Sequence, residues 1–143
     1  YDADAGTVTA AYGTATAKAH ADSLYTNQDN TDGVIPSDKS VGDVKVEGLK
    51  TILIRTVKQQ AENLLNQTDW YITRKAEKNT AIPSAITTWR DGIRTKQAAM
   101  ETSITNASNT PALETLYEYV NTADEGEPVV MARPLGEFPE LGS

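Results

Sequence analysis

The chain has 143 residues, of which 20 are acidic and 13 basic, so its net charge is −7 at pH 7 and its isoelectric point is near 4.6. This length fits one domain, and the acidic balance argues against nucleic-acid binding, which needs a basic surface to release phosphate counterions. Because there is no cysteine, disulfides, thiolate metal sites and a cysteine nucleophile are excluded.

Apolar residues are scarce for a globular domain. They make up 38% of the chain, and only one Phe and two Trp are available to fill a core. We therefore expect a modest helical core with poorly covered arms, rather than one compact core that uses every residue. The uninterrupted apolar stretches are only a few residues long, so no segment is predicted to span a bilayer.

The first stretch, residues 1–47, is rich in Ala, Thr, Gly and Asp, with scattered single apolar residues. Residues 7–9 are compatible with a short strand, and residues 15–25 with a helix of mostly alanine. Residues 27–33 and 35–38 follow with strong turn signals. Ordering the backbone costs roughly 1–2 kcal/mol per residue, and this stretch has too little apolar area to offset that cost. We therefore expect an irregular N-terminal arm.

Two amphipathic helices are predicted in the middle of the chain. Apolar residues recur at three- and four-residue steps over residues 49–65, and Gly48 and Asn66 are suitable ends for this helix. A second apolar stripe covers residues 82–104, and Pro83 suits its first turn, where the missing N–H is not needed. Joined by a short polar connection, the two helices predict a helical hairpin.

A shorter third helix is predicted after a polar stop. Thr110 is expected as its N-cap with Pro111 just inside, and its apolar stripe extends to Val120. If this helix packs on the hairpin, the fold is mainly α, with a helical core domain at residues 48–121 and extended N- and C-terminal arms.

Residues 122–143, the C-terminal strap, are punctuated by Pro and Gly, which exclude a continued helix. Yet Met131, Leu135, Phe138 and Leu141 make the segment too apolar for a solvated tail. We therefore expect an extended strap that lies either on its own domain or on a neighbouring molecule.

Residues that commonly take part in catalysis or metal binding are sparse. His20 is the single histidine, and without a second imidazole or a cysteine a solvated or packing role fits it best. Residues 28–39 are similar to a calcium loop but lack the carboxylates required at both end positions. Acidic pairs such as Glu125 and Glu127 have no apolar pocket around them. We expect no enzyme activity, no catalytic or metal-binding residues, no cofactor and no small-molecule substrate.

The most specific segment connects the two long helices. Thr68 and Asp69 are expected to cap the turn, and Trp70 and Tyr71 to anchor it against the second helix. On that helix, two arginines four residues apart are well placed to hold Asp69 or Glu77 from beside the apolar stripe. These arginines are Arg90 and Arg94.

This segment resembles tail proteins of bacteriophages, in particular the tail-fibre assembly proteins and tail assembly chaperones of marine cyanophage-like viruses. The matching residues are Leu64, Leu65, Thr68, Asp69, Trp70, Arg74, Ile82, Pro83, Trp89, Arg90 and Arg94. The resemblance covers about a fifth to a third of the chain. It implies protein contacts and assembly, and it brings no catalytic residues with it.

The chain departs from that family in one respect. The segment usually lies near the C-terminus of the assembly proteins, whereas here the chain continues from Arg94 to Ser143. This difference favours a component that stays in the particle over a transient tail-fibre assembly chaperone. The expected function is a structural protein of a tailed bacteriophage virion, in the tail, neck, baseplate or fibre region, assembled in the host cytoplasm. A head decoration protein and a tail-tip enzyme or cell-wall-binding module are alternatives.

The expected partners are other virion proteins and further copies of the chain, without nucleic acid or membrane. Both arms are expected to dock on these partners. Trp70 and Trp89 are assigned to the internal core and Phe138 to an intermolecular contact, because aromatic side chains contribute strongly to both. The predicted core or interface anchors are Trp70, Tyr71, Trp89, Arg90, Arg94, Met131, Leu135, Phe138 and Leu141.

Overall fold

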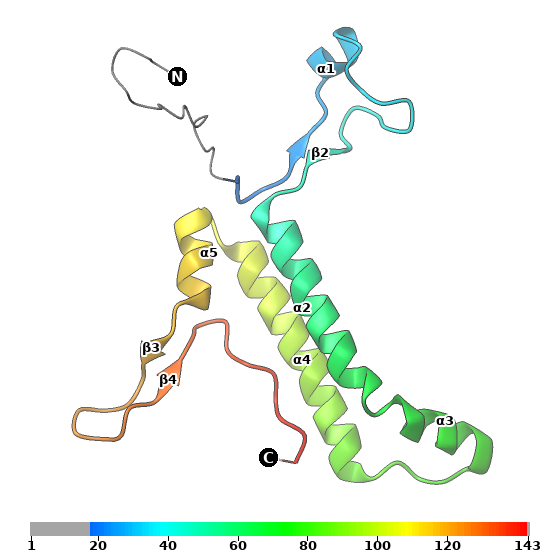
Figure 1. Cartoon of the computed structure of the whole chain (residues 1–143), viewed down its shortest axis with the longest axis vertical. Coiled ribbons are helices and arrows are strands. Elements are labelled where there is room, and N and C mark those ends of the chain that lie inside the picture. The colour runs from blue at the N-terminus through cyan, green and yellow to red at the C-terminus, as the bar shows by residue number, and fades with distance from the viewer. Residues whose placement is uncertain (1–17, 143) are drawn as a thin grey trace, which may run out of the picture.

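Two long antiparallel helices form the body of the molecule (Figure 1). In the computed structural model, which describes residues 18–142, α2 spans Leu49–Asn66 and α4 spans Ser84–Asn106. Their apolar stripes face one another, so that Ala61 of α2 and Ile93 of α4 are fully buried. The mainly helical fold and the predicted hairpin are confirmed, as are the ends of α2 at Gly48 and Asn66.

The core consists of two clusters of buried side chains. One lies where α5 (Thr110–Tyr117) packs against the hairpin, and the other lies further along the two long helices. The buried residues of the first are Val57, Met100, Ile104, Ala107, Leu113 and Leu135; those of the second are Ala61, Trp89 and Ile93. None of the helices in residues 18–142 is long and apolar enough to cross a membrane.

The predicted short connection between the long helices contains a further helix, α3 (Asp69–Lys78). Asn79, with a φ of 53°, ends it in the left-handed conformation that commonly terminates helices. No residue of α3 is buried. Its apolar residues do not form one stripe, so it was not predicted as a helix. The expected turn is confined to residues 67–68, where Thr68 is the N-cap of α3, and Trp70 and Tyr71 belong to the helix instead.

Residues 18–22 cross the N-terminal end of α2. The first two N–H groups of that helix donate to the carbonyls of Ala19 and His20, at 2.9 and 3.0 Å, and the Gly48 N–H donates to Asp22 Oδ1 at 2.6 Å. The helix expected at residues 15–25 is wrong over its described part, because these groups satisfy helical N–H donors that have no partner within α2. Residues 15–17, and the strand expected at residues 7–9, lie outside the described residues.

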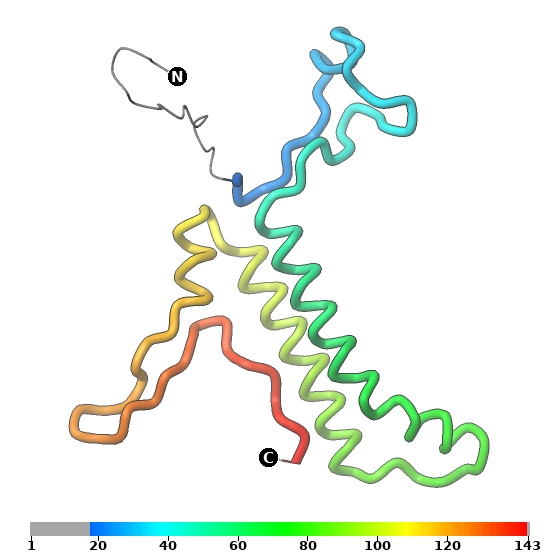
Figure 2. Tube along the Cα trace, in the orientation of Figure 1, coloured from blue at the N-terminus to red at the C-terminus, as the bar shows by residue number. Residues whose placement is uncertain are grey.

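The rest of the N-terminal arm projects from the body beside the start of α2 (Figure 2). It contains β1 (Ser23–Leu24), the one-turn helix α1 (Asn27–Thr31) and β2 (Val44–Val46), and the two strands pair antiparallel. Thr26 and Asp29 form a capping box at the start of α1. All three residues of β2 are exposed, so the arm leaves apolar surface uncovered.

A second projection follows α5. The Asn109 side chain, not Thr110, caps α5 by accepting from the Ala112 N–H at 2.9 Å. The helix ends three residues before Val120, which instead begins β3 (Val120–Asn121). This strand pairs antiparallel with β4 (Met131–Ala132) to form a hairpin away from the body (Figure 1).

Residues 133–142 return along the body. Leu135 is only 3% exposed, and its N–H donates to a carbonyl of α5 at 3.0 Å. Phe138 packs against both core clusters, and the Trp89 Nε1–H donates to the Pro139 carbonyl at 2.8 Å. This part of the strap lies on its own domain. Of the two alternatives for the strap, these residues follow the one within the chain, because the α2–α4 hairpin and α5 offer Leu135 and Phe138 an apolar surface. The expected intermolecular role of Phe138 stays a prediction.

Candidate protein-binding surfaces

Arg90 connects the end of α2, the start of α3 and α4. Its buried guanidinium lies 2.9 Å from the carboxylate of Asp69. The same nitrogen donates to the hydroxyl of Thr68 at 2.7 Å and to the carbonyl of Leu65 at 2.8 Å. The predicted pairing with Asp69 is confirmed. Because a charge-assisted contact to a buried guanidinium is strong, this network fixes the direction in which α3 leaves the hairpin.

The first turn of α3 presents two stacked aromatic rings to solvent. The ring centroids of Trp70 and Tyr71 are 3.7 Å apart, with an angle of 28° between their planes. Trp70 is 51% exposed, so its assignment to the internal core was wrong. The reason is the direction of α3, which leaves Trp70 outside the hairpin instead of packing it against α4.

Arg74 completes this cluster. Its guanidinium carbon lies 4.8 Å from the centre of the Trp70 ring and 5.2 Å from that of Tyr71, within the range of a cation–π contact. Arg74 Nε is buried without a hydrogen-bond partner, and within residues 18–142 the side chain makes no ion pair. The two terminal nitrogens of Arg74 make no hydrogen bond within the described residues, so they remain available as donors for another molecule.

Five side chains of α3 share one face of the helix, which Glu77 borders beside Trp70. At 100° per residue, they fall within an arc of about 140°. The face combines two aromatic rings with three cations, although the chain as a whole has a net charge of −7. We call it the α3 surface; its residues are Trp70, Tyr71, Arg74, Lys75 and Lys78.

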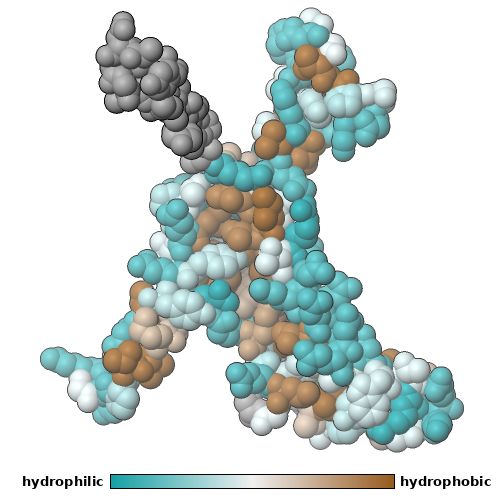
Figure 3. All heavy atoms as spheres, in the orientation of Figure 1, coloured by the Kyte–Doolittle hydropathy of each residue, from teal (hydrophilic) through white to brown (hydrophobic). Residues whose placement is uncertain are grey.

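A second exposed surface lies on the β3–β4 hairpin. Val129 is 70% exposed, and Figure 3 shows apolar atoms over the two strands and hydrophilic atoms over the connecting loop. No basic residue occurs between Glu118 and Ala132. The Asn121 side-chain oxygen accepts from two loop N–H groups, at 3.0 and 3.1 Å, which holds the loop in shape. We call this the hairpin surface; its residues are Val120, Asp124, Glu125, Glu127, Val129, Val130 and Met131.

An apolar hollow of about 730 Å³ lies between the first turns of α4 and residues 139–142. Ile86 and Trp89 form one wall, and Pro139 and Leu141 the other. Leu141 is 49% exposed at this rim. Two of the predicted anchors, Trp89 and Leu141, therefore meet in one place.

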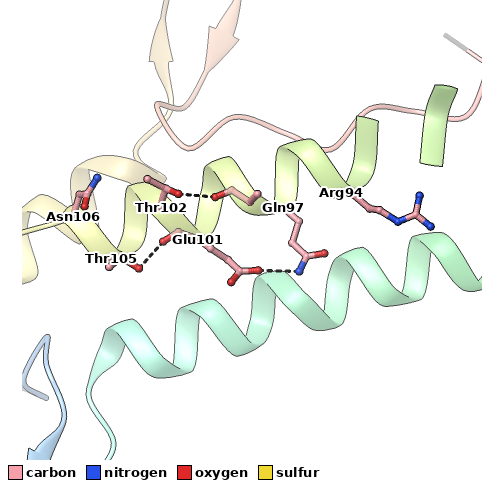
Figure 4. A pocket seen from close by; sticks show the side chains of 7 residues that line it. Arg94, Gln97, Glu101, Thr102, Thr105 and Asn106 are labelled. Atoms are coloured by element: carbon pink, nitrogen blue, oxygen red, sulfur yellow. Dashed lines mark hydrogen bonds between the residues drawn. The ribbon is translucent and has the colours of Figure 1, made fainter. Parts of the chain in front are cut away.

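A polar depression of about 500 Å³ lies along the second half of α4. Figure 4 shows Gln97 and Glu101 pointing toward α2, where the Gln97 amide donates to the Glu101 carboxylate at 2.8 Å. Lys58 of α2 lies 3.5 Å from the same carboxylate. Since the Lys58–Glu101 contact joins the two helices, we interpret the depression as part of the α2–α4 contact.

The remaining predicted residues lie apart from these surfaces. Arg94 is exposed and pairs with Asp91 of its own helix at 3.1 Å, not with the acidic residues of α3. His20 serves α2 through its backbone carbonyl. Within residues 18–142 no three His, Asp or Glu side chains lie close enough to hold a metal ion together.

The predicted anchors thus belong to several places in the fold. Arg90 and Leu135 are buried, whereas Met131 and Trp70 are exposed on two different projections. Arg74 was not among the predicted anchors. Its spacing from the two rings, at i+3 and i+4, is informative only once residues 69–78 are known to be helical. In comparisons with known proteins, no family model, no curated protein and no solved structure matches the chain.

Proposed function

We propose that the protein is a structural component of a tailed bacteriophage virion, in the tail, neck, baseplate or fibre region, and that it acts by binding other proteins. The observation that supports this most is the exposed apolar surface on three projections: the β1–α1–β2 arm, α3 and the β3–β4 hairpin. Examples are Val46 on the arm, Trp70 on α3 and Val130 on the hairpin, each more than half exposed. Exposed apolar patches of this kind are typical of protein interfaces.

Narrow projections favour contacts between molecules. An apolar side chain on a two-stranded hairpin or a one-turn helix has no second layer of its own chain to cover it, whereas a neighbouring subunit can cover it. Repeated copies in a particle also raise the effective concentration of each weak contact. The net charge of −7 opposes non-specific association of the free subunit.

The segment that resembles phage tail proteins adds support. It comprises the end of α2, all of α3 and the first half of α4. Its matching residues include the Arg90–Asp69 pair and the stacked pair of Trp70 and Arg74. The resemblance therefore falls on the residues that orient and form the α3 surface.

Mass spectrometry of purified particles tests this proposal. Particles of the phage that encodes the chain should contain it in a fixed ratio to the major tail protein. A replication enzyme of the same phage serves as the control and should be absent. If the chain is abundant in infected cells but missing from the particles, the proposal fails and the assembly-chaperone alternative replaces it.

A further inference from the structure

The α3 surface and the hairpin surface are opposite in charge and alike in apolar character. The first has three cations beside two aromatic rings, and the second has three carboxylates beside four apolar side chains. Within residues 18–142, none of these six charged side chains forms an ion pair. The cations of the α3 surface therefore complement the carboxylates of the hairpin surface.

The two surfaces cannot meet within one molecule. Figure 1 shows α3 and the β3–β4 hairpin on opposite sides of the α2–α4 body. The core contacts of Leu135 hold the chain after β4 on α5, and the Arg90 network holds α3 at the far end of α2. A contact between the two surfaces must therefore join two copies of the chain.

We propose that the α3 surface of one copy binds the hairpin surface of the next copy, head to tail. The contact uses two different patches, so an open assembly keeps one free α3 surface at one end and one free hairpin surface at the other. Such a contact builds a closed ring or an open filament, depending on the rotation between copies. This inference rests on the proposed structural function and specifies its partner as the chain itself.

Arg74 is the residue best prepared for this contact. Its guanidinium is already held against two rings, so little side-chain freedom remains to be lost on binding. An arginine can bind a carboxylate with two parallel hydrogen bonds, and Glu125 and Glu127 offer carboxylates on the loop. The exposed Trp70 ring offers a flat apolar face to Met131 beside them.

Sedimentation velocity of the full chain tests the inference, over about a hundredfold range of protein concentration. The wild-type chain should form species larger than dimers. Raising the salt from about 0.01 M to 1 M should reverse this, because the screening length falls from about 30 to 3 Å.

Two variants separate the patches. The first, Trp70→Ala with Arg74→Ala, removes the α3 contribution; the second, Glu125→Gln, Glu127→Gln and Val129→Ser together, removes the hairpin contribution. Each should raise the dissociation constant by about 30-fold or more, as expected for central interface residues. All five positions are unburied, so the helical circular-dichroism signal should persist. Lys39→Ala, which removes an exposed cation on the N-terminal arm, is the matched control and should associate like the wild type.

Mixing the two variants gives the decisive result. The mixture contains one intact α3 surface and one intact hairpin surface, so it should form a dimer that does not grow further. A monomeric wild type, a mixture that stays monomeric, or variants that associate like the wild type would overturn the inference. If that happens while the chain is present in purified particles, the proposed function survives with another virion protein as partner; if the contact forms but particles lack the chain, the function fails instead.

Discussion

At Gly48 the backbone of α2 passes so close to Ala21 that an added Cβ would overlap its carbonyl carbon. Gly48→Ala is therefore expected to displace residues 18–22 and to leave the N–H groups of Leu49 and Lys50 without their carbonyl acceptors. We expect the free energy of unfolding to fall by about 1–3 kcal/mol. Hydrogen exchange of these two amides should become faster, whereas Gln59→Ala, at an exposed position of α2, should leave it unchanged. Unchanged exchange in Gly48→Ala would show that the crossing does not cap α2.

Asp29 gives the N-terminal arm a dependence on pH. Lys45 Nζ donates to its carboxylate at 2.5 Å and the Thr26 hydroxyl and N–H donate as well, which lowers the pKa of Asp29 from 3.8 to about 2. Because the folded arm favours the charged carboxyl, this stabilisation is fully present above the ordinary pKa of 3.8 and is lost as the pH falls toward 2.

Nuclear magnetic resonance titration measures this directly. The Asp29 carboxyl should titrate with a midpoint of about 2, and Lys45→Ala should move the midpoint toward 3.8. Lys39 belongs to the same arm but makes no ion pair within residues 18–142, so Lys39→Ala should leave the midpoint of Asp29 unchanged. A wild-type midpoint near 3.8 would contradict the Lys45–Asp29 contact.

Residue spacing predicted one part of the candidate site and missed another. The pairing of Arg90 with Asp69 follows from charges on facing segments, and the structure contains it. The exposure of Trp70 could not be predicted, because it depends on the direction in which α3 leaves the hairpin. Arg74 was missed for the same reason, since its contact with the rings exists only if residues 69–78 form a helix.

At the scale of elements, Leu135 and Phe138 make the returning part of the C-terminal strap a part of the core. Leu135→Ala should lower the free energy of unfolding by about 2–5 kcal/mol, because it leaves a cavity at a position that α5 and the α2–α4 hairpin enclose. Leu141→Ala removes the same atoms from an exposed position and should lower the free energy of unfolding by less than about 0.5 kcal/mol. Thermal unfolding followed by circular dichroism compares the two. Equal losses would show that the strap does not pack as described.

The same packing revises an expectation based on sequence alone. If the strap docked only on a neighbour, deleting residues 128–143 would leave the helical signal nearly intact. The structure instead predicts that the α2–α4 hairpin becomes less stable. The deletion removes Leu135 and Phe138 from the core, and it removes the Pro139 carbonyl that accepts from Trp89. Assays of such a truncated chain therefore need a measurement of its stability.

Elements with an apolar stripe were predictable, and the others were not. Both long helices bury such stripes, and their sequences located them to within a few residues. Helix α3 buries no residue, so periodicity gave no sign of it. Residues 18–25 favour a helix locally, but the unpaired N–H groups of α2 hold part of them in an extended form. Local propensity was overridden there by a contact with residues far along the sequence.

At the scale of the whole molecule, a small body supports three projections (Figure 1), and each of them has exposed apolar side chains. Most of the buried apolar residues belong to the α2–α4 hairpin, to α5 and to the returning part of the strap. The apolar side chains that stay exposed lie mainly on α3 and on the β3–β4 hairpin. These two elements carry opposite charges and lie apart from each other. This arrangement suits a subunit that associates through specific contacts of opposite charge.

Cryo-electron microscopy of purified particles is the most direct test of this account. With the chain located in the map, the α3 surface and the hairpin surface should both be covered by neighbouring protein, and the α2–α4 hairpin should keep the form described above. A map in which both surfaces face solvent, or in which no density fits the hairpin, would contradict the claim that uncovered apolar projections are sites of assembly.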